Sequence, residues 1–382
     1  MSGTAEQSVM PARDAEAETR SGIFPAQGLK GLIDTGLISA EDGILPEQIQ
    51  PASIDLRLGG TAYRLPASFL PGTRTVEDKL ALFAEEKIDL DKGAVLETGK
   101  VYLVRLQENL ALKKRMSGVA NPKSSTGRLD VFCRVITDYA TEFDQIAERY
   151  NGPLWLEIAP RSFNVKVRRG TRLSQIRLKR GTPPSSDAFV RRLHEEVRIV
   201  RDDEGAADVK DGAIALSVDV MGDPATGLIG YKARKTREPI DLDLVNYYEV
   251  ADFWDEVYRP KDGGLVLKTD EFHILATKET VCVPNDLAGD MIAYDTLVGE
   301  FRVHYAGFFD PGFGTNPSGV NGTKIVLEVR SHEVPFLLEH GQIVGRVVVE
   351  RLTEPTEKPY GAGIGSSYQG QGLTLGKHFR RR

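Results

Sequence analysis

The sequence repeats itself at a fixed distance, and this repeat restricts the possible fold more than any other feature. The segment DKGAVLETGKVYLV, which begins at Asp91, matches DGGLVLKTDEFHIL, which begins at Asp262, so the shift is 262 − 91 = 171 residues. The same shift pairs Glu157 in LWLEI with Glu328 in IVLEV. A shift that holds without a gap over this length indicates a tandem duplication, so we expect two copies of one folding unit.

The repeat divides the 382 residues into two domains of ordinary size. We expect a disordered leader at 1–22, a first copy at 23–185 and a second copy at 193–382. The stretch KRGTPPSSDAFVRRLHEE between the copies is rich in proline and serine and then in charge. Residues 186–192 are therefore expected to form a linker.

Short apolar runs within each copy predict β-strands. Examples are VYLVRL, SQIRLKR, IVLEV and VGRVVVERL, which are bounded by Gly, Pro, Asn and Asp. The pattern indicates a mainly β fold whose strands form an antiparallel sandwich or barrel. We expect only a few short helices, with one at GLKGLIDTGLI near the start and another around Asn246 to Tyr258.

Composition and charge exclude several classes of function. The formal net charge of −6 argues against a general nucleic-acid-binding protein, which needs an excess of cations. No apolar run approaches the roughly 20 residues that cross a bilayer, so no membrane partner is expected. The two cysteines, Cys133 and Cys282, form no C-x-x-C pair, and the reducing cytoplasm is the expected location. The histidines form no H-E-x-x-H or deaminase-type zinc signature, so we expect no zinc.

The stretch NPKSSTGRLDVF concentrates hydroxyl groups and cations. Lys123, Ser124, Ser125 and Arg128 lie within six residues, a set suited to an anion with several oxygens, such as a phosphate. A solvated turn between two strands is the simpler interpretation of the composition alone. The second copy reads YDTLVG over residues 294–299 and has lost every cation. This asymmetry favours a binding site that one copy keeps and the other lacks.

Two further motifs contain groups that could act on a bound molecule. The segment FRVHYAGFFDPGFG places His304 and Asp310 near the start and tip of an expected hairpin, where they could equally be a packed strand residue and a turn cap. Glu157 and Glu328 each lie between apolar strand residues. If such a glutamate points inward, burial raises its pKa and suits it to proton transfer. If it points outward, it is an ordinary surface residue.

Together these motifs resemble the dCTP deaminase branch of the trimeric dUTPase superfamily. The resemblance lies in KSSTGRL and the strand after it, VHYAGFFDPGF, IVLEV, PFLLEHGQIVGRVVVERL and the tail KPYGAGIGSSYQGQG. The opening LKGLIDTGLI and IQPASIDLRLGG also resemble that family's N-terminus, and the doubled arrangement resembles the tandem-domain deaminases of bacteria. The resemblance covers nearly all of each copy and implies two tandem dUTPase-like domains, each a distorted β-barrel or jelly-roll.

The resemblance implies zinc-free hydrolytic deamination of dCTP to dUTP and ammonia, in pyrimidine deoxynucleotide metabolism. In this family one unit supplies the serine-rich phosphate segment, the next supplies the hairpin and the glutamate, and a C-terminal tail closes over the nucleotide. Carried onto this chain, the implied residues are Lys123, Ser124, Ser125 and Arg128 from the first copy, His304, Ala306, Asp310 and Glu328 from the second, and Tyr360 and Gln371 from the tail.

The resemblance also implies a role for each group. Glu328 would take a proton from the attacking water and pass it on, while Ser124 and Arg128 position the water and Asp310 anchors the deoxyribose. A hydrated Mg²⁺ would bind through the triphosphate. The implied partners are dCTP, dTTP as a feedback inhibitor, and further copies of the chain in a homo-oligomer.

The chain departs from the family's pattern at several positions. Lys123 stands where arginine is usual, and Ser367 stands where the tail usually has lysine. The first copy lacks the Asp-Pro-Gly turn but keeps Glu157, which could be a relic, a structural residue or the true catalyst. We favour Glu328, because its hairpin matches the family better.

Two other functions remain open from the sequence. A dUTPase, or a bifunctional deaminase that continues to dUMP and pyrophosphate, would use closely similar residues. A non-catalytic nucleotide-binding regulator would keep the fold and the binding residues without turnover. The fold alone does not decide between these functions.

Overall fold

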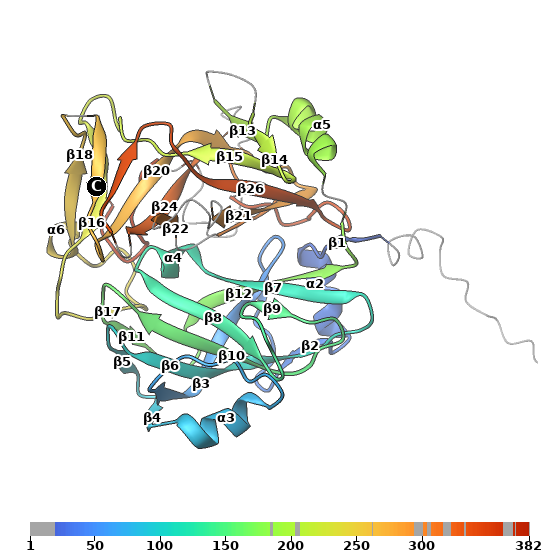
Figure 1. Ribbon diagram of the computed structural model, residues 1–382. Helices are drawn as coiled ribbons and strands as arrows, with labels where there is room; N and C mark the ends of the chain where they lie inside the picture. Colours follow the sequence, from blue (N-terminus) through green and yellow to red (C-terminus); the bar gives the residue numbers. More distant parts are fainter. Residues whose placement is uncertain are drawn as a thin grey trace, which may run out of the picture.

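The structure is a computed structural model that describes residues 20–183, 186–202, 207–261, 263–293, 301–303, 307–315, 322–331, 334–361, 370 and 372–381. The chain is mainly β with a few short helices, which confirms the predicted fold class. Figure 1 shows two β-rich halves in contact, one formed by residues 20–183 and the other by most of the residues from 186 onward, while β17 (Ile240–Asp241) lies with the first half.

The N-terminal half is built on one large, strongly curved sheet. Its main path runs in the order β8-β10-β6-β3-β12-β7-β9, and β1, β2 and β4 pair at its margins. The strands are β1 (Gly22–Ile23), β2 (Ile38–Ala40), β3 (Ile54–Leu65), β4 (Glu86–Asp89), β6 (Val101–Ala111), β7 (Met116–Pro122), β8 (Val131–Thr137), β9 (Gln145–Ile146), β10 (Asn151–Pro160) and β12 (Arg172–Arg180). Because one short helical turn connects β7 to β8 at the opposite end of the path, the sheet curls toward a barrel.

The C-terminal half contains two sheets that pack over a second core. One has the order β18-β16-β20-β24-β22, with β13 beside β20, and the other has the order β14-β15-β26-β21-β23. Their strands are β13 (Val200–Arg201), β14 (Val209–Lys210), β15 (Ala213–Ser217), β16 (Leu228–Ala233), β18 (Trp254–Tyr258), β20 (Phe272–Val281), β21 (Leu287–Ala293), β22 (Phe301–Val303), β23 (Phe308–Phe309), β24 (Thr323–Ser331) and β26 (Ile343–Arg351). A small ribbon pairs β19 (Gly264–Leu267) with β25 (Phe336–Glu339).

The helices are short and follow local signals. The predicted helix near the start is α2 (Ala26–Asp34), which buries Ala26, Leu29 and Leu32 at helical spacing. The expected linker at 186–192 is largely helical, because Ser186 caps α5 (Asp187–Val197) by accepting a hydrogen bond from the Phe189 N–H. The remaining helices are α3 (Val76–Phe83), α4 (Ser124–Gly127), α6 (Val250–Phe253) and the 3₁₀ turn η1 (Pro46–Gln48).

The helix predicted around Asn246 to Tyr258 is wrong. Only the four residues of α6 are helical, and the chain then extends into β18, which pairs with β16. Phe253 ends α6 and Trp254 begins β18, and both side chains are buried. Pairing with the edge of β16 and burial of both rings therefore override the local helical pattern.

The two halves share a continuous core. A ring cluster joins Phe163 of the N-terminal half to Trp254 at 5.3 Å and Phe253 at 5.9 Å between ring centroids, and Phe379 packs on both of those rings. β17 (Ile240–Asp241) pairs in parallel with β11 (Val165–Val167), which also pairs with β5 (Ala94–Leu96). These contacts fix the relative position of the halves and hence of any site between them.

Candidate active site

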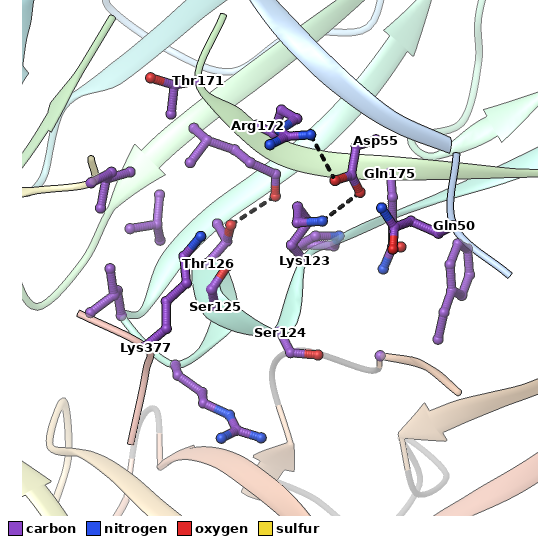
Figure 2. A pocket seen from close by; sticks show the side chains of 18 of the residues that line it. Gln50, Asp55, Lys123, Ser124, Ser125, Thr126, Thr171, Arg172, Gln175 and Lys377 are labelled. Carbon is purple, nitrogen blue, oxygen red and sulfur yellow. Dashed lines mark hydrogen bonds and ion pairs between the residues drawn. The ribbon is translucent and has the colours of Figure 1, made fainter. Parts of the chain in front are cut away.

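A cavity of about 670 Å³ lies between the two halves. From the N-terminal half it is lined by β7, α4 and the start of β12, and from the C-terminal half by β23, β24 and the segment around Lys377. Figure 1 shows α4 at the boundary between the halves, and Figure 2 shows the labelled side chains around the cavity. The size is that of a pocket for a small molecule.

The serine-rich stretch forms a single tight turn at the wall of the cavity. β7 ends at Pro122, which has no N–H to continue the ladder, and the chain enters α4 through Lys123. The Lys123 N–H and the Thr126 hydroxyl both donate to the Leu173 carbonyl, at 2.9 and 2.8 Å. These two bonds fix α4 on β12, so that Ser124 and Ser125 line the cavity.

Cations gather on one side of the cavity. Lys123 Nζ lies 2.5 Å from Asp55 Oδ1, and Arg172 Nη1 lies 3.9 Å from Asp55 Oδ2 (Figure 2). Lys377 lines the same cavity; burial lowers its pKa, and the charges of Lys123 and Arg172 lower it further. Lys123 and Arg172 pair with Asp55, and Lys377 adds a third cation whose charge Asp55 and Asp243 favour, so this side of the cavity suits an anion with several oxygens.

The hairpin of the C-terminal half forms the facing wall. A Cβ built on Gly307 would lie 4.0 Å from Ser124 Oγ, so the two walls come close at this point. Gly312 has φ = +93°, and a Cβ there would lie 2.8 Å from the Tyr360 nitrogen, so this turn requires glycine. The Tyr360 N–H donates to the Pro311 carbonyl at 2.7 Å, which brings Tyr360 to the cavity.

Glu328 projects from the middle of β24 and lines the cavity, although only 5% of the residue is exposed. Burial raises the pKa of Glu328 to about 8, and the nearby Arg128 guanidinium opposes this rise. Arg128 itself is held by donation of Nη1 to the Thr374 carbonyl at 2.9 Å. A carboxyl that titrates near neutral pH can both accept and release a proton during a reaction.

Asp310 lies on the same wall and is a second carboxyl whose pKa is raised. Burial raises its pKa to about 6, while the positive charges of Arg177 and Lys123 oppose the rise. Within the described part of the chain, Asp310 Oδ1 accepts no hydrogen bond. This oxygen faces Arg177 Nη2 at 3.6 Å, and the residue lines the cavity, which places its carboxyl beside a bound molecule.

The predicted site residues fall into three groups. Seven of them line the cavity: Lys123, Ser124, Ser125, Arg128, Asp310, Glu328 and Tyr360. Glu157 is not among the described residues that line it. His304, Ala306 and Gln371 lie outside the described residues. The structure thus brings Ser124 and Glu328 to one cavity within a single chain, while the chemical roles of these residues stay predictions.

Several lining residues were missed by the sequence reasoning. Asp55 and Gln175 lie inside the quoted segments IQPASIDLRLGG and SQIRLKR but had no predicted role, and Arg172, Lys377 and His378 lie outside the quoted motifs. Gln175 offered a signal, because it is a polar residue inside the buried strand LSQIRL and is only 8% exposed. Lys377 offered none, because its position depends on how the last residues fold back.

No three His, Cys, Asp or Glu side chains among the described residues are grouped so that they could hold a metal ion. None of the described helices is both long and apolar enough to span a bilayer. The fold and the site thus define a mainly β protein with a cationic cavity, of nucleotide size, between its two halves.

Comparison with known proteins identifies the family. The family models for the N-terminal and C-terminal domains of 2'-deoxycytidine 5'-triphosphate deaminase match residues 20–182 and 186–379. The crystal structure of 2'-deoxycytidine 5'-triphosphate deaminase from Agrobacterium tumefaciens is 50% identical, covers 90% of this chain and 99% of its own, and superposes with a TM-score of 0.85. The chain belongs to the 2'-deoxycytidine 5'-triphosphate deaminase family, as the sequence motifs predicted.

Curated relatives match over a shorter length. Proteins named "dCTP deaminase, dUMP-forming" include one from Mycobacterium avium, 38% identical over 117 residues, and one from Mycolicibacterium gilvum, 37% identical over 127 residues. These matches cover 29% and 32% of this chain, and 57% and 63% of the relatives' own lengths. The chain therefore spans somewhat more than half of each of these relatives.

Proposed function

We propose that the protein hydrolyses the exocyclic amine of dCTP and releases dUTP and ammonia. The observation that carries the proposal is the meeting of two kinds of group on one cavity. Glu328, with its pKa raised to about 8, lines it from the C-terminal half, and the hydroxyl and cation groups of residues 123–128 line it from the N-terminal half. Hydrolytic deamination of a nucleoside triphosphate requires an acid–base group for the base and an anion-binding wall for the phosphates.

The proposed binding mode follows the charge distribution. The triphosphate binds where Lys123, Arg172 and Lys377 lie, and the hydroxyls of α4 donate to its oxygens. Asp310 accepts a hydrogen bond from the sugar hydroxyl. Mg²⁺ binds through the phosphate oxygens and neutralises part of their charge, in keeping with its preference for phosphates over a protein cage. Tyr360 covers the edge of the cavity beside the hairpin.

The proposed chemistry balances with one water. The Glu328 carboxylate accepts a proton from a water molecule as the water oxygen bonds to C4 of cytosine. The carboxyl passes this proton to N3, takes the second water proton from the C4 hydroxyl and donates it to the amine, and the C4–N bond breaks so that ammonia leaves as the C4 carbonyl of uracil forms. Arg128 stabilises the charged form of Glu328, and Ser124 orients the water.

A bifunctional reaction is the second candidate. The curated relatives named above carry the name "dUMP-forming", and they match this chain at 37–38% identity. In this reaction a second water would attack the α-phosphorus of dUTP and release pyrophosphate. Feedback inhibition by dTTP and a homo-oligomeric assembly are further proposals of the same kind, based on the resemblance to the family.

The decisive experiment is incubation of the purified protein with dCTP and Mg²⁺, followed by separation of the products, beside a Glu328→Gln variant. Release of dUTP and ammonia by the unmodified protein alone supports the deaminase. Accumulation of dUMP and pyrophosphate supports the bifunctional reaction. If dCTP binds without any turnover, the deaminase proposal fails and a regulatory protein remains.

A further inference from the structure

A buried arginine connects the two halves beside the proposed sugar site. Arg177 lies in β12 of the N-terminal half, between the core residues Ile176 and Leu178. Only 1% of Arg177 is exposed, although an arginine is seldom buried without partners. Its position in an apolar strand therefore calls for a specific set of contacts.

The Arg177 guanidinium contacts described residues of the C-terminal half. Nη1 donates to the Gly289 carbonyl at 3.0 Å and to Asp290 Oδ1 at 2.9 Å. Nη2 lies 3.4 Å from the Phe309 carbonyl, which accepts its hydrogen bond, and 3.6 Å from Asp310 Oδ1. The guanidinium carbon also lies 4.0 Å from the centroid of the Phe308 ring.

These contacts divide one positive charge between two carboxylates. Asp290 receives a direct hydrogen bond, whereas Asp310 receives only a longer ion pair. The longer pair stabilises the negative charge of Asp310 at Oδ1, while the residue still lines the cavity. Asp310 is thereby held as a charged acceptor whose lone pairs remain available to a ligand hydroxyl.

We propose that Arg177 is a positioning residue that keeps Asp310 charged and fixes the segment Phe308–Asp310 against the cavity from the opposite half of the chain. The inference rests on the proposed function in one respect, because it assigns Asp310 to the sugar of the nucleotide. It adds a residue of β12 that does not itself contact the substrate. The charge on Asp310 then depends on how the two halves dock.

The groups around Asp310 set the expected pH dependence. Arg177 and Lys123 stabilise its charge, Asp55 opposes it, and Asp290 competes for Arg177. Burial raises the pKa of Asp310 to about 6 even with Arg177 present. An opposite charge at this distance typically lowers a carboxyl pKa by about 1–3 units, so removal of Arg177 should bring the pKa of Asp310 above neutral pH.

The test measures dCTP binding by calorimetry from pH 5.5 to 9 in the Glu328→Gln background, which removes both turnover and the titration of Glu328. The parent should lose affinity only below pH 6. With Arg177→Met added, affinity at pH 7 should fall by about tenfold, and the difference should vanish near pH 9, where Asp310 ionises without help. The nucleotide's own titrations are common to both proteins and cancel in the ratio of the two dissociation constants.

The pH dependence separates positioning from a general structural defect. A loss of affinity that is equal at pH 7 and pH 9, or no loss at either pH, would overturn the proposal. Asp290→Asn is the matched variant. It removes the other carboxylate of the ion cluster, so that, among the described residues, Asp310 is the one remaining carboxylate paired with Arg177. This variant should lose affinity for dCTP at a lower pH than the parent does. If Arg177→Met does not fold, an unchanged pH profile for Asp290→Asn overturns the proposal instead.

Failure of the proposed function gives a different result. If the Glu328→Gln protein does not bind dCTP at any pH, the nucleotide assignment is wrong and Arg177 is tested without ligand. The ¹³C carboxyl resonance of Asp310, assigned with an Asp310→Asn variant, should titrate at higher pH in Arg177→Met than in the unmodified protein. An unchanged titration would overturn the inference about Arg177 itself.

Discussion

Glu157 and Glu328 occupy matching places in the two halves, yet they have different surroundings. They lie 328 − 157 = 171 residues apart, each in the middle of a central strand, and only 2% and 5% of the two residues is exposed. Glu157 Oε1 accepts two hydrogen bonds from Arg134, at 2.5 Å from Nη2 and 3.0 Å from Nε. Glu328 instead lines the cavity and has its pKa raised to about 8.

The difference shows that the partner of a buried carboxyl, and not burial alone, decides its chemistry. Arg134 lies directly opposite Glu157 on the neighbouring strand β8, and its guanidinium lies 3.5 Å from the centroid of the Phe143 ring. The arginine therefore neutralises Glu157 and packs beside it. Arg128, which lies on a neighbouring element, partly opposes the rise in the pKa of Glu328. The Glu328 carboxyl still lines the cavity.

The largest difference between the two glutamates should appear in kcat when each is changed to glutamine. Glu328→Gln should lower kcat for dCTP by about 10³-fold, because loss of a general acid–base group typically costs 10²–10⁴-fold. Glu157→Gln should leave kcat within about threefold, since its carboxyl is already paired. Steady-state release of ammonia measures both variants. A larger loss in Glu157→Gln than in Glu328→Gln would reverse the assignment.

The pH dependence of stability should separate the same two residues. A carboxyl whose pKa is raised from 4.5 to about 8 on folding stabilises the fold at low pH, and this contribution disappears as the pH rises through 8. Glu328→Gln should therefore gain about 2–3 kcal/mol relative to the unmodified protein between pH 6 and pH 9. Urea unfolding at the two pH values measures the gain. A difference that stays constant with pH would show that Glu328 is not buried as a titrating group.

The cationic wall should show a smaller effect on binding. Lys377→Met removes one of the three cations near Asp55 and should raise KM for dCTP about tenfold with little change in kcat, because the lost interaction is with the triphosphate. Stability without ligand should not fall, since Lys377 repels Lys123 and Arg172. Lys30→Met, which removes an exposed lysine of α2, is the matched control. Equal KM values for the two variants would remove Lys377 from the binding wall.

The smallest effect on activity and stability should come from a change of Arg134, the partner of Glu157. Arg134→Lys keeps the charge but loses the planar contact with Phe143 and the second hydrogen bond to Glu157. It should cost about 1 kcal/mol of stability and leave turnover of dCTP unchanged. Urea unfolding and the ammonia assay measure the two quantities. A loss of turnover without a loss of stability would mean that Glu157 takes part in the reaction.

Features that depend on neighbouring residues in sequence could be predicted before the structure. The helix α2 follows from its apolar spacing, and the turn at Gly312 follows from the Asp-Pro-Gly sequence. The tight turn of residues 123–128 was recognised because its composition is unusual and because the second half lacks it. Such signals are local, so the sequence is sufficient to read them.

Features set by contacts between residues distant in the sequence could not be predicted. The pattern around residues 246–258 resembles a helix, and only the pairing of β18 with β16 and the burial of Trp254 override it. Lys377 reaches the cavity because the chain around it docks through its carbonyl on the Asn246 N–H at 2.9 Å. Arg177 is a charged residue inside a buried strand, which indicates a specific partner. Its partners lie more than a hundred residues away, so the sequence does not identify them.

The distribution of the cavity walls over two halves of one polypeptide has a consequence for how such a protein can evolve. In a ring of identical subunits, every substitution appears in both walls of every site. Here a substitution near Ser124 changes one wall only, and a substitution near Glu328 changes the other. Selection can therefore refine each wall separately.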